Sequence, residues 1–450
     1  MAVDAGVQPV RKAGVLKNVF SIGIVQVANY VFPLLTLPYV SRIIGPDKLG
    51  VINFAAAFVV YFVLLINFGF DLTATRAIAS NRSNLEERNR IFNLVLLAKS
   101  LMLAISIVIF VVLLFAMPQF REEKATAIFS FLVCFAWVIT PNWLFQGMQE
   151  LTRVAIFNLA AKTIFTILIF VFIREKVDYV WQPLAVSIAQ IGVGVYSFVY
   201  AIKRYKITLK RPKTKDALNL LWKERIIFFS SVVVNLYTTT NVVLLGFLQT
   251  AEQVGYYTAG WRLILIAQQM ISVPISQALF PYIGAAFSES RDRGIDIVRQ
   301  LFPIITAITI AASIALYFLG PLTILIVYGE AFEPAVPAFQ TLAFIPIIIG
   351  WNNLLGIQTM INLKMDRSFF RITTLGAVIS LALNFLLVTR LGFIGSAWSW
   401  LLTEMLITGS MFFVLYRMGI NMIEKKYFTA NHFVRFLKPI ILIIQQKIKK

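Results

Sequence analysis

Long runs of apolar residues alternate with short polar segments along almost the whole chain. A helix that crosses a bilayer needs about 20 mostly apolar residues, and twelve stretches are of this kind. They cover residues 15–40, 49–70, 91–117, 124–148, 151–173, 180–202, 226–248, 254–284, 299–328, 334–361, 369–390 and 393–416. The segments between them are too short to hold a soluble domain. The pattern predicts an all-α polytopic membrane protein with about twelve transmembrane helices.

The composition requires that many apolar side chains face lipid. Of the 450 residues, 59% are hydrophobic and only 14% are charged, whereas about 25% of a soluble domain is charged. The mean hydropathy is +0.80. Arg11, Lys12 and Lys17 precede the first apolar stretch. That stretch is too long for the apolar core of a signal peptide and lacks a small-residue cleavage site, so we interpret it as the first membrane helix.

The positive charges follow the alternation of the spans. The net charge is +20, which in a soluble protein would suggest a nucleic-acid partner. With a cytoplasmic N-terminus, 31 of the 41 Lys and Arg residues fall in cytoplasmic segments, seven in outer segments and three inside helices. Cytoplasmic loops of membrane proteins carry such an excess. The distribution predicts a multi-pass protein of the bacterial inner membrane, with both termini cytoplasmic, membrane lipids as partners and no nucleic acid.

A basic loop, residues 203–225, divides the spans six and six and holds nine of these cations. Such a loop orients the chain in the membrane and can also contact anionic lipid. We therefore expect an N-lobe, a linker, a C-lobe and a basic tail. Their predicted bounds are residues 1–202, 203–225, 226–416 and 417–450.

The two halves carry a faint internal repeat. Residues 45–50 read GPDKLG and residues 250–255 read TAEQVG, so that Asp47 matches Glu252 and Gly50 matches Gly255. Each segment joins the first two spans of its half. Because six spans return the chain to its starting side, the halves are predicted to be parallel repeats around a central cavity, which alternating access would open to either side.

Three cations lie inside predicted spans, where a Lys or Arg at the helix centre costs about 2.5–3.5 kcal/mol. Lys162 is near the middle of its span, with Asn158 one turn before it on the same face. Arg262 shares a face with Thr258 and Gln269, and Lys99 lies in the third span. Charged residues at this depth usually face a water-filled cavity. The alternatives are a structural ion pair for Lys162 and side chains that reach the interface for Arg262 and Lys99.

Glu404 is the carboxylate deepest in a predicted span, with Trp400 and Thr408 one turn to either side. It is a candidate for ion coupling, and the alternative is that it neutralises a cation in the cavity. Asp71, at a helix end, is a second candidate, although such residues are commonly solvated caps. Three deep cations against one deep anion favour an anionic cargo, because a positive cavity attracts anions and Lys and Arg bind phosphate oxygens.

Helix ends and kinks provide further candidates. Arg42 ends the first predicted span and could guard the outer mouth of the cavity, although it could equally be a solvated anchor. Pro33 and Pro38 are in the same span. Proline kinks a helix, so the two prolines are candidate hinges, but prolines are also common in membrane helices for other reasons.

The residues of enzymatic or metal sites are scarce. There is one cysteine, Cys134, and one histidine, His432, so we expect no disulfide framework, no metal site and no cofactor. We find no P-loop and no paired acid and base groups. A membrane-embedded enzyme of polysaccharide synthesis would need such a pair at a water-exposed site, so an enzyme remains only the alternative from a different class.

Several short runs are more distinctive than the composition. Residues 33–45 read PLLTLPYVSRIIG, residues 49–55 read LGVINFA, residues 67–70 read NFGF, residues 75–79 read TRAIA, and residues 254–259 read VGYYTA. Together they resemble the bacterial polysaccharide transporter family. These are the Wzx-type O-antigen flippases of the multidrug/oligosaccharidyl-lipid/polysaccharide exporter superfamily. The likeness extends over the chain in length and topology and is sharpest over residues 33–79.

The resemblance implies a V-shaped fold of two lobes with a cationic lumen. It implies that undecaprenyl-diphosphate-linked oligosaccharides are moved from the cytoplasmic to the periplasmic leaflet for O-antigen or related polysaccharides. It also implies an antiporter coupled to H⁺ or Na⁺ and a polysaccharide polymerase as a partner. A role in binding this anionic cargo is carried over to Lys162, Arg262, Lys99 and Arg42, with Asn158 beside Lys162.

Two transporters of the same superfamily remain as alternatives. A lipid II flippase would share the fold, but its typical relatives are longer and carry two extra helices, and residues 433–444 are too few to span a bilayer. A cation-coupled multidrug exporter would also share it. An exporter of organic cations should hold an excess of deep carboxylates, which this sequence lacks.

Overall fold

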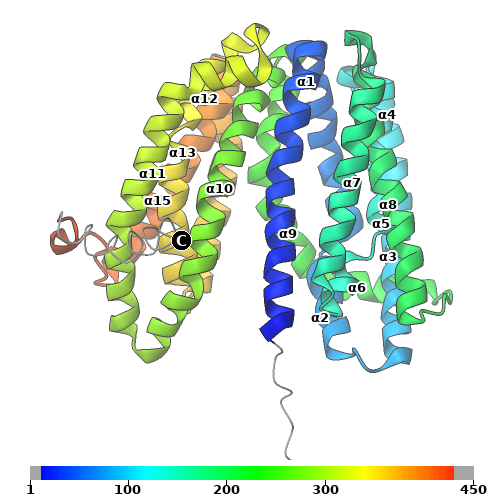
Figure 1. Ribbon diagram of the computed structural model, residues 1–450, viewed down its shortest axis with the longest axis horizontal. Coiled ribbons are helices and arrows are strands. Elements are labelled where there is room, and N and C mark those ends of the chain that lie inside the picture. Colours follow the sequence, from blue (N-terminus) through cyan, green and yellow to red (C-terminus); the bar gives the residue numbers. More distant parts are fainter. Residues whose placement is uncertain (1–11, 430–450) are drawn as a thin grey trace, which may run out of the picture. The chain divides into compact units, whose positions relative to one another are not determined.

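The computed structural model describes residues 12–429, except for the side chains of residues 12–31, 33–34, 230, 233–238 and 277–278. Every regular element in this part of the chain is helical (Figure 1). Ten of its helical stretches are long and apolar enough to cross a membrane. The predicted all-α membrane fold is therefore confirmed.

The first half of the chain forms eight α-helices. They are α1 (Lys12–Asn67), α2 (Phe70–Ser80), α3 (Leu85–Ala116), α4 (Lys124–Phe131), α5 (Val133–Ile139), α6 (Asn142–Gly147), α7 (Leu151–Phe172) and α8 (Trp181–Tyr205), with 3-10 turns η1 (Pro118–Phe120) and η2 (Lys176–Val180). The long helix α1 combines the first two predicted spans and is interrupted at Gly45, with φ 76° and ψ 174°. Glycine adopts this positive φ without steric cost.

The second half continues in the same way. It comprises α9 (Thr214–Leu248), α10 (Ala251–Glu289), α11 (Arg291–Tyr328), η3 (Glu330–Ala335), α12 (Val336–Leu342), α13 (Ile345–Asn352), the π-helix η4 (Asn353–Met360), α14 (Asp366–Leu391), α15 (Phe393–Arg417) and η5 (Lys425–Tyr427). With α1 taken as two spans, and with α4–α6 and η3–η4 each taken as one, the described chain agrees with about twelve spans.

The chain divides into two compact units. Unit 1 runs to Asn235 and also includes Thr250–Gly255 and Val327–Ala331; unit 2 comprises the remaining residues. The division falls inside α9, whose first turns occupy the second part of the predicted linker. The lobe bounds expected from the sequence therefore stay a prediction.

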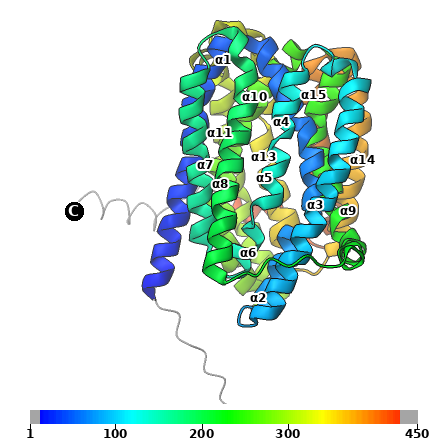
Figure 2. The same ribbon diagram turned by 90° about the vertical axis from the view of Figure 1, so that its right-hand side faces the viewer.

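Aromatic rings fill the core of unit 1. Phe110 of α3 stacks on Phe131 of α4, with ring centroids 4.1 Å apart, and Phe62 of α1 meets both rings edge-on. Aromatic pairs in stacked and edge-on geometry stabilise a core beyond the area that they bury. Helix α1 packs against α3, α4, α5 and α7, and α8 packs against α4, α5 and α7. In Figure 2, α2 and α6 lie together at the lower end of this unit.

Unit 2 is organised around α15, which packs along α14 and contacts α12 and α13. Close approach of these helices depends on small residues. A Cβ atom on Gly376 of α14 would come within 2.4 Å of the Ile407 side chain, and one on Gly395 of α15 within 2.2 Å of the Leu387 carbonyl oxygen. Small residues at such contacts are a common way to pack membrane helices.

The two glycines matched by the sequence repeat meet inside unit 1. A Cβ atom on Gly50 would lie 1.6 Å from the Ala251 carbonyl oxygen, and one on Gly255 would lie 2.0 Å from the Pro46 carbonyl oxygen. No side chain fits at either position without movement of the backbone. The repeated segments thus form one close backbone contact.

Candidate functional site

Helix α7 of unit 1 presents a partly accessible cation, Lys162. Lys162 lies near the middle of this 22-residue helix, about 16 Å from either end at 1.5 Å per residue. Its side chain is half-buried, and Asn158, one turn earlier, is exposed. The two polar groups therefore share one accessible face of an otherwise apolar helix, as the sequence predicts.

Helix α10 of unit 2 presents Arg262, whose side chain is exposed. The neighbouring polar residues do not all share that exposure. Gln269 is exposed, whereas Thr258 is only 3% exposed and lies in the interior of unit 2. The polar stripe expected from the sequence is therefore narrower in the structure, with Arg262 and Gln269 as its accessible members.

Arg42 lies in α1 one turn before the interruption at Gly45, and it is exposed. A Cβ atom on Gly329 would lie 3.5 Å from the Cγ atom of Arg42, so the stem of this side chain lies along the 327–331 segment of unit 1. Just after the interruption, Asp47 forms an ion pair with Lys176 at 2.9 Å and Lys48 forms one with Glu123 at 2.8 Å. These pairs join the middle of α1 to η2 and to the residue that precedes α4.

The interruption in α1 bears on the two candidate hinges. The one residue with non-helical backbone angles inside α1 is Gly45, seven positions after Pro38. The side chain of Pro33 lies outside the described residues, and that of Pro38 is half-buried. A hinge at these prolines during transport stays a prediction.

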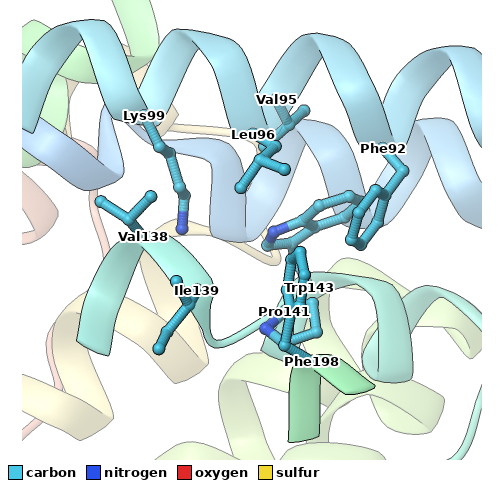
Figure 3. A pocket seen from close by; sticks show the side chains of 9 residues that line it. All are labelled: Phe92, Val95, Leu96, Lys99, Val138, Ile139, Pro141, Trp143 and Phe198. Carbon is cyan, nitrogen blue, oxygen red and sulfur yellow. The ribbon is translucent and has the colours of Figure 1, made fainter. Parts of the chain in front are cut away.

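Lys99 occupies a different environment from the other candidate cations. Its side chain is 1% exposed, and its Nζ atom donates a hydrogen bond to the backbone oxygen of Trp137 at 3.2 Å. In Figure 3 the ammonium points from α3 toward Val138 and Ile139 at the end of α5. Among the ion pairs of the described residues, none involves Lys99. The side chain is covered by protein and lines a small, mostly apolar pocket.

Asp71 lies in the first turn of α2 and is half-buried. The side-chain amide of Asn67 donates to its carboxylate, and the Thr75 hydroxyl donates to its backbone oxygen at 2.6 Å. A carboxylate at this position is favoured by the positive end of the helix dipole. The local geometry is that of a helix-start residue, while its role in ion coupling stays a prediction.

Glu404 lies inside unit 2 and is 6% exposed. The side-chain amide of Asn352 donates to its Oε2 atom at 3.1 Å, and no ion pair of the described residues includes it. Trp400 and Thr408, one turn to either side, are buried as well. An unpaired buried charge carries a large desolvation penalty, and a role of Glu404 in ion coupling stays a prediction.

Sequence reasoning missed one buried polar group. Gln358 is 1% exposed, and both polar atoms of its amide lack a hydrogen-bond partner. It lies in the π-helix η4 and lines a recess with Ser272, Ser276 and Asn353. An ordinary helical pattern cannot place this residue, because the wider π turn changes which side chains face inward.

Comparison with known proteins adds the family. A family model described as polysaccharide biosynthesis protein matches residues 15–287, more than half of the chain. The chain belongs to the polysaccharide biosynthesis protein family. The family resemblance inferred from residues 33–79 is thereby confirmed.

Relatives within and near this family are transporters by name. The chain is 28% identical over 404 residues to an Escherichia coli K12 protein named "Putative O-antigen transporter", covering 89% of this chain and 96% of that protein. It is also 28% identical to a Shigella dysenteriae protein of the same name, covering 87% and 97%. A Haloferax volcanii "Probable low-salt glycan biosynthesis flippase" is 22% identical, covering 45% and 43%.

Solved structures place this family member in a known fold. The structure is similar to the lipid II flippase MurJ in an inward closed conformation, with a TM-score of 0.70, 13% identity and coverage of 88% of this chain and 87% of that one. It is also similar to an inward-facing multidrug resistance MATE family transporter of the MOP superfamily, with a TM-score of 0.67, 15% identity and coverage of 88% and 98%. At these identities the likeness confirms the fold of a multi-pass membrane transporter.

Proposed function

We propose that this protein moves a lipid-linked oligosaccharide with an anionic head group, such as an undecaprenyl-diphosphate-linked repeat unit, from the cytoplasmic to the periplasmic leaflet. The observation that carries the proposal is Lys162, a half-buried cation at the middle of an apolar helix in a member of the polysaccharide biosynthesis protein family. The O-antigen transporter relatives support a surface polysaccharide as the destination of the cargo.

The chemistry of the accessible cations supports a diphosphate. Lys162 and Arg262 are both partly or fully exposed at membrane depth, where a charge persists only beside water or a partner. An ammonium and a guanidinium are strong donors to phosphate oxygens, and a positive surface raises the local concentration of anions. The same features disfavour an exporter of organic cations, which those side chains would repel.

Transport in this proposal is by alternating access, with both termini cytoplasmic. Glu404 is the first candidate for the coupling group, because its buried carboxylate has an amide donor but no described cation. Asp71 is the second candidate. The coupling ion is H⁺ or Na⁺, either of which a buried carboxylate can accept.

The test is complementation of a strain that lacks the chromosomal gene. Lys162→Ala and Arg262→Ala are expected to lower surface polysaccharide by about tenfold or more, since each removes a charge-assisted contact, while membrane levels stay unchanged. Lys162→Arg should keep most activity. The matched control is Lys215→Ala, which removes an exposed lysine at the start of α9. Normal polysaccharide in both the Lys162→Ala and the Arg262→Ala variant would contradict binding of the diphosphate by these residues.

A further inference from the structure

The fourth span of unit 1 is interrupted at Thr140 and Pro141. Helix α5 ends at Ile139, and the Thr140 N–H donates to the Ala136 oxygen at 2.9 Å. The next carbonyl, that of Trp137, would accept from the N–H of residue 141 in a continuous helix. Residue 141 is proline and has no N–H. The break thus leaves the Trp137 oxygen without its helical donor, in the interior of the membrane span.

Lys99 supplies the missing donor from a neighbouring helix. Its Nζ atom lies 3.2 Å from the Trp137 oxygen, and most of the side chains around it are apolar, among them Phe92, Val138 and Phe198 (Figure 3). The carboxylate of Asp71 attracts the ammonium electrostatically without forming an ion pair with it. A buried charge is tolerated where it is hydrogen-bonded, and a cation is favoured at the negative, C-terminal end of a helix. The Trp137 oxygen, which lacks a helical donor, and the buried ammonium of Lys99 therefore stabilise one another.

Side chains of α2 and of the turn that follows it contact backbone oxygens on the other side of the break. The Thr75 hydroxyl, which donates to the Asp71 oxygen at 2.6 Å, shares its proton with the Trp143 oxygen at 3.2 Å, and Arg82 Nε, in the turn after α2, donates to the Gly147 oxygen at 2.7 Å. Both carbonyls belong to α6, the short helix that follows Pro141. Side chains of α3, of α2 and of the turn after α2 thus contact backbone oxygens on the two sides of the interruption, and Lys99 is the one that contacts the α5 side.

We infer that Lys99 is a positioning residue that fixes the interrupted fourth span by binding the carbonyl that Pro141 leaves free, and that it does not contact the cargo. The role follows from the contact between Lys99 and Trp137 and does not depend on what the protein transports. It separates Lys99 from Lys162, which is accessible and is proposed above to bind the diphosphate.

The chain carries its own probe for this role. Cys134 is the one cysteine in the sequence, is fully buried, and lies on α5 one turn before Trp137. Its rate of alkylation by N-ethylmaleimide, which enters membranes, reports how often α5 leaves its packed position. The inference predicts that Lys99→Met speeds this reaction by about tenfold or more, because local opening becomes easier.

A second substitution decides whether the free carbonyl is the cause. Pro141→Ala restores an N–H at position 141 and removes the proline that disfavours helical angles at Thr140, which is extended with φ −82° and ψ 107°. With α5 extended by one residue the helix supplies the donor, so the double variant K99M/P141A should label within about twofold of the wild type. Lys162→Met is the matched control: it removes a lysine of unit 1 from α7, which packs against α1, α6 and α8, and it should leave Cys134 labelling unchanged even if it abolishes transport.

Two results would overturn the inference. One is an alkylation rate for Lys99→Met equal to that of the wild type. The other is a double variant that labels as fast as Lys99→Met alone, because the missing donor would then not be the reason for the opening. Failure of the proposed transport function would appear separately, as normal polysaccharide in the Lys162 and Arg262 variants with the labelling results unaffected.

Discussion

The fourth span of the first half and the fourth span of the second half are both interrupted, but oppositely charged side chains meet the two breaks. In unit 1, α4, α5 and α6 follow one another, and the ammonium of Lys99 binds a backbone oxygen near the end of α5. In unit 2, α12, α13 and the π-helix η4 follow one another, and the carboxylate of Glu404 accepts from Asn352 at the end of α13.

The difference suggests a division of labour between two similar halves. The amine of Lys99 can donate to the Trp137 oxygen whether it is charged or neutral, and its charged form repels a coupling cation, so the break in unit 1 is suited to a constant structure. A buried carboxylate that accepts from a neutral amide can retain that hydrogen bond in either protonation state, because a protonated carboxyl still has an acceptor oxygen. We hypothesise that ion coupling resides in unit 2 and that the break in unit 1 keeps one geometry.

Reversing the charge of Lys99 in unit 1 is expected to have the largest effect. Lys99→Glu places a carboxylate against the Trp137 oxygen in an apolar surrounding, and an uncompensated buried charge destabilises by about 3–5 kcal/mol. We expect folded protein in the membrane to fall by tenfold or more, because a tenfold change in an equilibrium already corresponds to a loss of about 1.4 kcal/mol. The measurement is fluorescence-detected size-exclusion chromatography of solubilised membranes.

The control for charge reversal is Lys162→Glu on the accessible face of α7. It should accumulate almost as well as the wild type, because water can solvate the new carboxylate, although its transport should fail. Similar accumulation of the two reversed variants would show that the side chain at position 99 is accessible to water.

Glu404→Gln tests the other half with a smaller expected effect on folding and a clear one on transport. Glutamine keeps an acceptor for Asn352 but cannot ionise. We expect transport driven by an ion gradient to fall by about tenfold or more, as for loss of coupling between two ligand sites, while Tm stays within about 2 °C. Purified protein in liposomes, with a fluorescent polyprenyl-diphosphate sugar, gives both measurements.

Separate H⁺ and Na⁺ gradients in that assay identify the coupling ion. The gradient that drives the wild type but not Glu404→Gln is the one that Glu404 senses. Asp71→Asn serves as the comparison for unit 1 and should retain gradient-driven transport. If Asp71→Asn loses coupling and Glu404→Gln keeps it, the division of labour is the reverse of our hypothesis.

Much of this architecture could be predicted from the sequence, because long apolar runs and alternating Lys and Arg define membrane spans by themselves. The span that contains Lys162 was placed almost to the residue, since α7 is a regular helix between two short turns. The breaks were harder to predict. Pro141 signals a kink, but nothing in a linear sequence shows that Lys99 donates to the oxygen of Trp137, which lies 38 residues later in the chain.

The same limit applies to the burial of the candidate site residues. Lys99 and Lys162 look alike in sequence, as single lysines within apolar runs, yet one is 1% exposed and the other is accessible. Helical periodicity gives the direction in which a side chain points from its helix axis, but not which neighbouring helix covers that side chain. Gln358 was overlooked for a related reason, because the π-helix departs from the 3.6-residue period on which the sequence argument depends.

The smallest expected effect concerns the side-chain amide of Gln358 in unit 2, which lacks a hydrogen-bond partner. The break in unit 1 has its free oxygen satisfied by a lysine, whereas the π-helix in unit 2 leaves both amide atoms of Gln358 buried without a partner. An unsatisfied buried polar group costs about 1–3 kcal/mol. Gln358→Met, of similar size and apolar, should therefore raise Tm by roughly 1–4 °C, measured by intrinsic tryptophan fluorescence in detergent.

Gln249→Met is the matched control, because the amide of Gln249 donates to the Val388 oxygen at 3.0 Å. The same change there removes a hydrogen bond that is made, so Tm should fall by about as much, at about 1 kcal/mol per bond. If Gln358→Met lowers Tm as well, the amide has a partner in solution, such as a water or a cation held with Ser272 and Asn353 in the recess. The break in unit 2 would then be filled by a bound ligand, whereas the side chain of Lys99 fills the break in unit 1.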